Sequence, residues 1–117
     1  MGSSDLLTVG IDARGAAVVV SVRGELDLAT VPVLRERLES VGEVSSAPSP
    51  LVIDLSSVTF IGSAGLALLV ELHNQCTERG TPLAVVATGT VVPRAIQVTA
   101  LDQVFAVHPT VDEALHA

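Results

Sequence analysis

The sequence predicts an α/β protein in which a mixed sheet of about five strands packs against helices. Short segments rich in Val, Leu and Ile alternate with longer segments whose apolar residues recur at helical spacing, the pattern of a layered α/β architecture. Residues 51–55, Leu-Val-Ile-Asp-Leu, form a nearly continuous apolar run, which is typical of a parallel strand covered on both faces. At 117 residues, the whole chain, 1–117, is expected to form a single domain.

Composition and charge limit the classes of function. A formal charge of -7, with no Lys, disfavours nucleic acid and anionic membrane surfaces as partners. The longest apolar stretch, 64–70, is far shorter than the roughly 18 to 20 residues of a membrane-spanning helix, and no signal peptide is visible. We therefore expect a soluble, cytoplasmic protein. Cys76 is the single cysteine, so we expect a small buried apolar side chain and no disulfide or cysteine zinc cluster.

The chain is expected to begin with a β-hairpin. Residues 1–5 are small and polar and are expected to be flexible. Apolar residues alternate with polar ones over 7–11, which predicts a first strand with one buried face. A turn at 12–15 separates it from a second strand at 16–22, so the two are expected to pair through a four-residue connection.

A helix is predicted after the hairpin. Residues 23–30 leave the second strand, and Thr30 is a suitable N-cap. Gly42 is expected to end the helix, and a Ser- and Pro-rich loop at 43–50 follows it. The apolar stripe of this helix consists of Val31, Leu34, Leu38 and Val41.

The central segment is the strand 51–55, a turn and a long helix. Residues 58–61 are too apolar for a solvated loop and are expected to lie under the edge of the sheet. They lead to Gly-Ser-Ala-Gly at 62–65, after which helical spacing continues to Gly80. Ser63 is therefore expected at or beside the N-cap, where small neighbours leave it approachable by another protein.

The last third of the chain is expected to complete the sheet. A strand at 83–87 after the central helix predicts a right-handed parallel crossover, which places Ser63 near the carboxyl end of its strand. A helix is predicted at about 92–100 and a last strand, at a sheet edge, at 104–107. Thr110 and Glu113 have the spacing of a capping box for a short final helix.

Three interpretations of Ser63 are open from the residues alone. The first is a helix-capping serine. The second is a hydrolase nucleophile in a Gly-x-Ser-x-Gly elbow, but Ile61 stands where the first glycine is required, and the three histidines are scattered along the chain. The third is a phosphorylation switch. Gly62 and Gly65 are too few for a phosphate-binding loop, and that motif also needs a lysine, which the chain lacks.

Two motifs together resemble the STAS domain, specifically the single-domain anti-sigma-factor antagonists of bacteria, over nearly the whole chain. The first is Gly-Glu-Leu-Asp at 24–27 before the first helix. The second is the strand 51–55 followed by Val58, Phe60 and Ser-Ala-Gly-Leu at 63–66. The resemblance implies that an anti-sigma factor, itself an ATP-dependent serine kinase, phosphorylates Ser63. It also implies that the unphosphorylated protein binds that factor and frees a sigma factor, with a phosphatase as a further partner.

The resemblance also implies a docking surface and no catalytic role. Expected partner-binding residues are Asp27, Thr30, Gly62, Ser63, Ala64, Gly65 and Leu66. Asp27 matches an acidic residue near the phosphorylation site in the family, although the residues alone equally allow an aspartate at a helix entry. The residues alone leave open that Asp27 and Asp54 lie near one another, but a carboxylate pair without further ligands is weak evidence for a metal, and a solvated or capping role is expected for both. We therefore expect no metal, no cofactor and no enzyme.

The sequence departs from the family pattern on both sides of Ser63. The family usually has an aspartate before the serine and a Ser or Thr after it, where this chain has Gly62 and Ala64. A regulatory binding module without phosphorylation control therefore remains an alternative, and a small serine hydrolase is the alternative from another class. The sequence leaves both a monomer and a weak dimer open.

Overall fold

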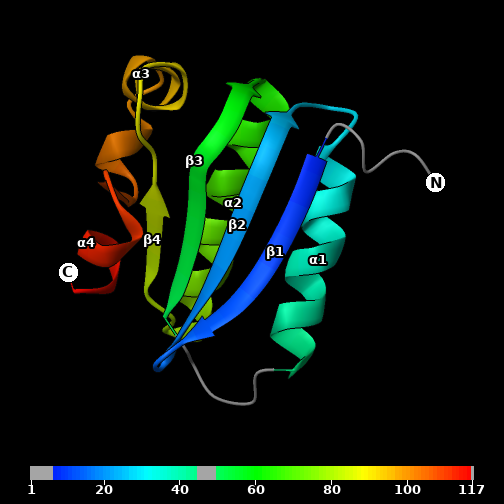
Figure 1. Cartoon of the computed structure of the whole chain (residues 1–117), viewed down its shortest axis with the longest axis vertical. Helices are drawn as coiled ribbons and strands as arrows, with labels where there is room; N and C mark the ends of the chain where they lie inside the picture. Colours follow the sequence, from blue (N-terminus) through cyan, green and yellow to red (C-terminus); the bar gives the residue numbers. More distant parts are fainter. Residues whose placement is uncertain (1–6, 45–49, 117) are drawn as a thin grey trace.

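Within the residues that the computed structural model describes, 7–44 and 50–116, the chain forms a five-stranded sheet with helices on both faces (Figure 1). The predicted α/β architecture is confirmed. The expected flexible segment 1–5 and most of the Ser- and Pro-rich loop lie outside the described residues. The elements are β1 (Leu7–Arg14), β2 (Ala17–Leu26), α1 (Val31–Val44), β3 (Leu51–Ile61), α2 (Ser63–Arg79), β4 (Leu83–Val86), α3 (Val91–Val98), the 3₁₀ helix η2 (Leu101–Gln103), β5 (Ala106–His108) and α4 (Val111–Leu115).

The strands follow the chain order β1-β2-β3-β4-β5 across the sheet. β1 pairs antiparallel with β2, whereas β2, β3, β4 and β5 are mutually parallel. The predicted hairpin and parallel crossover are therefore confirmed, and β5 lies at an edge. The hairpin turn is shorter than predicted, because Arg14 already pairs with Ala17. Gly15, with a φ of +62°, is the first of its two turn residues, a position where a hairpin turn favours glycine.

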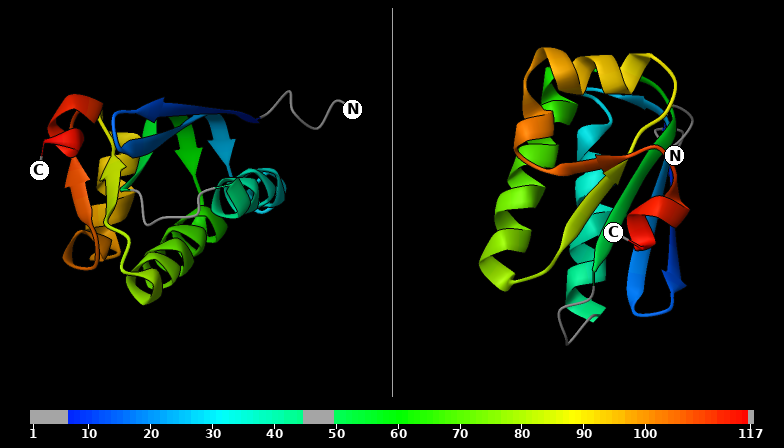
Figure 2. Two further views of the ribbon diagram at one scale, coloured as in Figure 1. Left: turned by 90° about the horizontal axis from the view of Figure 1, so that it is seen from below. Right: turned by 90° about the vertical axis from the view of Figure 1, so that its left-hand side faces the viewer.

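Helices cover the two faces of the sheet unequally (Figure 2). The main core joins buried side chains of β2 and β3 to those of α1, α2 and α3, and it is almost wholly aliphatic. A small second cluster, Val19, Val52, Val86 and Ala114, packs α4 against the opposite face. Both faces of β3 are thus covered at Val52 and Ile53, as the continuous apolar run predicts.

Several boundaries differ from the predictions. β2 continues to Leu26 and β3 continues to Ile61, so residues 58–61 form strand rather than a segment under the sheet edge. The two extensions pair with each other through register shifts, which sequence spacing does not reveal. Helix α1 passes Gly42 and ends at Val44, because one glycine weakens a helix without terminating it.

The ends of α2 and α4 agree with the sequence. Gly80 has a φ of +70°, and its N–H donates to the Thr77 carbonyl oxygen at 3.2 Å, so it terminates α2 as predicted. Thr110 caps α4, since its hydroxyl accepts the Glu113 N–H at 3.1 Å. In the described ranges, no helix combines the length and the apolar character needed to cross a membrane.

Candidate functional site

The carboxyl ends of β2 and β3 lie together at one edge of the sheet, where α1 and α2 begin (Figure 1). Leu26 lies beside Ile61 in the parallel pairing. The Gly62 backbone N–H then donates to the Leu26 carbonyl oxygen at 2.9 Å. This bond joins the turn 27–30 to the segment 62–66, and we refer to these two segments as the Ser63 site. The structure therefore brings together the two segments that the sequence predicts as one docking surface.

Ser63 is the first residue of α2, and its side chain is exposed. The N-cap is Gly62, with φ of -98° and ψ of -177°. Ser63 therefore lies beside the N-cap, as predicted, and the interpretation of Ser63 as the capping residue is wrong, because Gly62 occupies the N-cap position. The hydroxyl is left available to a reagent or a partner.

The N-cap of α2 provides no side chain to the backbone N–H groups of the first turn. The first bond of the helix runs from the Leu66 N–H to the Gly62 carbonyl oxygen at 3.1 Å. The N–H groups of the three residues before Leu66 have no intrahelical acceptor. Gly62 has no side chain to cap them, and this first turn contains no acidic residue. No side chain of the first turn therefore neutralises the positive end of the helix dipole beside Ser63.

Gly65 allows α2 to approach the strands closely. A Cβ atom at this position would lie 2.9 Å from both Leu26 Cγ and Ile61 Cγ1, and 3.1 Å from the Leu26 carbonyl oxygen. These distances are below normal carbon contacts, so a larger residue would push the helix away from the ends of both strands. Gly65 is buried and therefore positions Ser63, rather than offering a surface to a partner.

The turn 27–30 is held by its own hydrogen bonds. Asp27 Oδ1 accepts the N–H groups of Ala29 at 3.0 Å and Thr30 at 3.2 Å. The Thr30 hydroxyl donates to the Glu25 carbonyl oxygen at 2.8 Å and accepts the Asp27 N–H at 3.0 Å. Asp27 thus serves as the aspartate of a helix entry. Thr30 precedes α1 as predicted, but its hydroxyl bonds backward instead of capping the helix.

The predicted docking residues separate into exposed and supporting groups. Thr30 is only 2% exposed, so it supports the turn from inside. Ala64 and Leu66 are half-buried and pack against the main core. Asp27 and Gly62 are half-buried, while Ser63 is exposed at the edge between them. A partner can therefore reach Ser63 and the backbone on either side of it.

Two exposed apolar residues of this region were missed from the sequence, Leu28 and Phe60. Leu28 lies in the turn 27–30, and Phe60 lies at the end of β3. Phe60 was noted in the sequence as part of a motif, without a role of its own. The available signal was that a leucine stands in a turn and that one of only two aromatic residues immediately precedes the Ser63 segment.

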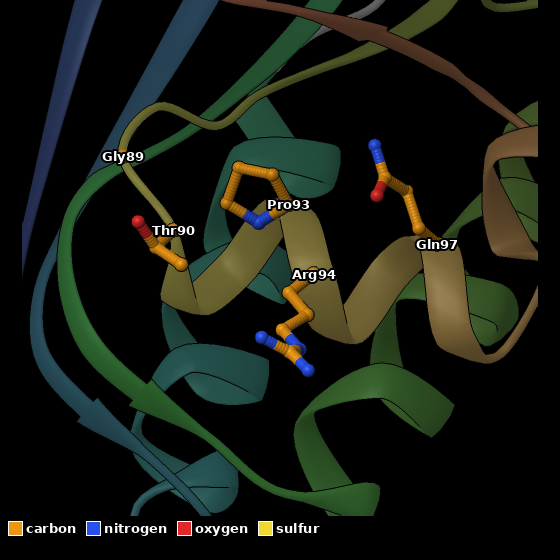
Figure 3. A pocket seen from close by; sticks show the side chains of 5 residues that line it. All are labelled: Gly89, Thr90, Pro93, Arg94 and Gln97. Carbon is orange, nitrogen blue, oxygen red and sulfur yellow. The ribbon is translucent and has the colours of Figure 1, made fainter.

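The arrangement gives no support to a serine hydrolase. His73 is ten residues beyond Ser63 on α2, roughly 15 Å along the helix axis. His108 lies on β5, and the His116 ring contacts the Asp112 carbonyl oxygen. An open hollow over α3 is lined by Gly89, Thr90, Pro93, Arg94 and Gln97 (Figure 3). Ser63 does not line this hollow, so it provides no substrate pocket for a nucleophile at Ser63.

The carboxylates do not form a metal site in the described part of the chain. Asp54 lies beside Ser21 in the first half of β3, and its Oδ1 accepts the N–H and hydroxyl of Ser56. Asp27 follows Leu26 at the far end of the strand pairing, so Asp27 and Asp54 do not form the carboxylate pair that the residues alone left open. Across residues 7–44 and 50–116, no group of three or more metal-ligating side chains occurs.

Comparison with known proteins identifies the family. The STAS domain model matches residues 9–114. The chain belongs to the STAS domain family. Within it, this STAS domain is related to anti-sigma factor antagonists of Mycobacterium tuberculosis. It is 36% identical over 115 residues to the anti-sigma-F factor antagonist RsfB, covering 98% of this chain and 92% of that protein. It is 31% identical over 114 residues to RsfA, covering 97% and 89% respectively.

Solved structures agree with this assignment. The STAS domain superimposes on the crystal structure of an anti-sigma factor antagonist from Mycobacterium paratuberculosis with a TM-score of 0.86 and 37% identity, covering 99% of this chain and 95% of the other. The unphosphorylated anti-sigma factor antagonist SpoIIAA gives a TM-score of 0.74 at 16% identity, covering 92% and 93%. The second likeness supports the fold alone, whereas the first agrees with RsfB and RsfA in placing this STAS domain in the anti-sigma factor antagonist family.

Proposed function

We propose that this STAS domain binds an anti-sigma factor of the serine-kinase type through the Ser63 site and thereby releases a sigma factor. In this proposal, phosphorylation of Ser63 by that kinase ends the interaction, and a phosphatase restores it. The observation that carries the proposal is that Ser63 is exposed as the first residue of α2, directly after an N-cap residue that has no side chain. The names of RsfB and RsfA support the class of partner.

Electrostatics favours a phosphate at this position within the free domain. A phosphoserine carries about -1.5 to -2 charge at neutral pH. The unpaired N–H groups of the first turn and the helix dipole would both stabilise that charge. The phosphate would therefore act through the charge and bulk that it presents to the partner, with the fold of the domain intact.

A second candidate is supported by the residues that flank Ser63. Gly62 and Ala64 provide neither the carboxylate nor the hydroxyl that the family pattern has there. A kinase that recognises its substrate through a carboxylate before the serine would phosphorylate Ser63 slowly. In that case the protein would bind its anti-sigma factor without phosphorylation control.

Intact mass after incubation with ATP and each candidate anti-sigma kinase separates the two candidates. The proposal expects a phosphate adduct on the wild type that is absent from Ser63→Ala. A matched variant, Gly62→Asp, restores the carboxylate. Its Cβ has room, since the nearest atom outside its chain neighbours is Phe60 Cε2 at 3.4 Å. An adduct on Gly62→Asp alone would indicate a kinase that needs the carboxylate, and complex formation without any adduct would favour the second candidate.

Binding titrations test the direction of the switch. Ser63→Ala should retain the affinity of the wild type for the anti-sigma factor, while Ser63→Asp should weaken it through charge at the contact. Circular dichroism of both variants would verify that each is folded. Equal affinities of Ser63→Ala and Ser63→Asp would argue against charge at Ser63 as the control.

A further inference from the structure

Two large apolar side chains are exposed on either side of the hydrogen bond that closes the Ser63 site. Leu28 is 82% exposed and Phe60 is 49% exposed. Leu28 is two residues after Leu26, the acceptor of that bond, and Phe60 is two residues before Gly62, the donor. The two side chains therefore belong to segments that the bond holds together.

Phe60 extends the Ser63 site onto the sheet. The next residue, Ile61, is buried in the main core beneath α2. Because neighbouring side chains of a strand point to opposite faces, Phe60 points away from that core. Its ring stays close to the site, since a Cβ on Gly62 would lie 3.4 Å from Phe60 Cε2. Beside Phe60 in the pairing is Glu25, which is exposed as well.

The use of aromatic residues makes Phe60 distinctive. The chain has two, and the other, Phe105, is buried in the main core. A single exposed leucine needs no explanation, but aromatic residues are enriched at protein interfaces relative to the rest of the surface, and the segment of Phe60 is hydrogen-bonded to the segment of Leu28. We propose that Leu28 and Phe60 are the apolar anchors by which this protein holds its anti-sigma factor, an inference that rests on the proposed function.

The charges around the anchors indicate the chemistry of the surface that receives them. Glu25 is exposed beside Phe60, and Asp27 adjoins Leu28. The chain as a whole has a formal charge of -7. The partner is therefore expected to present an apolar recess bordered by basic side chains, because complementary charge speeds encounter and fixes orientation. A second copy of this chain fits less well, since a symmetric contact would bring these carboxylates near one another.

The test compares the affinities of Leu28→Ala, Phe60→Ala and the wild type for the anti-sigma factor that the wild type binds. Val98→Ala is the matched control, because Val98 is 77% exposed at the end of α3 and outside the Ser63 site. Leu28→Ala and Phe60→Ala should each weaken Kd by about tenfold or more, and chiefly by raising the dissociation rate. Val98→Ala should stay within about twofold. Thermal unfolding of all three should show that they remain folded.

The outcomes distinguish the anchors from the function on which they rest. If Ser63→Asp abolishes binding while Leu28→Ala and Phe60→Ala bind like the wild type, the assignment of Leu28 and Phe60 as anchors is wrong and the proposed function stands. If the wild type binds no anti-sigma kinase, the proposed function and the anchors both fail. Sedimentation of the free chain tests a third outcome. If the wild type self-associates, and Leu28→Ala and Phe60→Ala abolish this self-association without changing the affinity for the partner, the surface is a dimer contact instead.

Discussion

The Gly62 backbone N–H donates a 2.9 Å hydrogen bond to the Leu26 carbonyl oxygen, and this contact fixes where Ser63 stands. Leu26 is fully buried in the main core, so the bond anchors the start of α2 to that core. Gly65 then lets the first turn of the helix lie directly on Leu26 and Ile61. Ser63 is therefore presented by packed elements rather than by a loose loop, which favours a reproducible docking geometry.

The first prediction concerns this close approach. Gly65→Ala should lower the free energy of unfolding by about 1–3 kcal/mol, because the new methyl group would overlap Leu26 and Ile61. The better helix propensity of alanine, worth up to about 1 kcal/mol, opposes this loss only in part. Gly10→Ala is the control, since a Cβ on Gly10 would have no neighbour within 4 Å. Urea unfolding of both variants decides the matter, and a Gly65→Ala protein as stable as Gly10→Ala would contradict the packing argument.

Elements with a strong local pattern could be predicted from the sequence, and elements set by pairing could not. The helix stop at Gly80 and the cap at Thr110 depend on residues within one turn, and both are where the sequence places them. The extension of β2 to Leu26 and of β3 to Ile61 depends on backbone pairing between the two strands. Local periodicity in the sequence does not indicate that pairing, so both strands were predicted too short.

The second prediction separates stability from binding at Ser63. Ser63→Asp places a negative charge in a first turn that has no acidic residue, so it should stabilise the free domain by about 0.3–1 kcal/mol at low salt. Ser63→Asn has a similar shape without the charge and should show little of this gain. Thermal unfolding at low and high salt measures the difference, which should shrink as salt screens the dipole. A loss of stability in Ser63→Asp alone would mean that the first turn is not the favourable anion position argued above.

At the candidate site, sequence reasoning located the segments better than the roles of their residues. The predicted crossover placed Ser63 near the carboxyl end of its strand, and Asp27 was expected beside it because the resemblance implies an acidic residue near the phosphorylation site. Which side chains face outward depends on packing that the sequence does not show. Thr30 and Gly65 proved to be buried, whereas Leu28 and Phe60 are exposed. Apolar residues are common at protein surfaces, so the structure was needed to single out these two.

The third prediction concerns the hydrogen bonds of Asp27. Asp27→Ala removes the acceptor of the Ala29 and Thr30 N–H groups and should cost about 1 kcal/mol of stability. Asp27→Asn keeps a side-chain carbonyl oxygen in the same place. It should therefore lower the free energy of unfolding by only a few tenths of a kcal/mol, which is about the difference between Asn and Asp as N-cap residues. Urea unfolding measures both. Equal losses in the two variants would show that the charge, rather than the acceptor, holds the turn. Asp27→Asn, folded in this way, is then the suitable variant for testing the charge in partner binding.

The fourth prediction concerns Cys76, which is 6% exposed on the inner face of α2. Burial raises the pKa of its thiol above the ordinary value of 9.0, and the positive charge of Arg79 opposes that rise in part. The thiol of the unfolded chain therefore ionises at lower pH than the thiol of the folded chain. The resulting stability is complete below about pH 9 and is lost as the pH rises through the folded-state pKa. The chain contains neither Lys nor Tyr, so few other side chains titrate in this range.

Urea unfolding between pH 8 and 10.5 should show the free energy of unfolding falling for the wild type, by at most about 1.4 kcal/mol per pH unit. Cys76→Ala, less stable throughout because of its lost packing, should show a flatter profile. Parallel profiles for the two proteins would mean that Cys76 is not the group responsible.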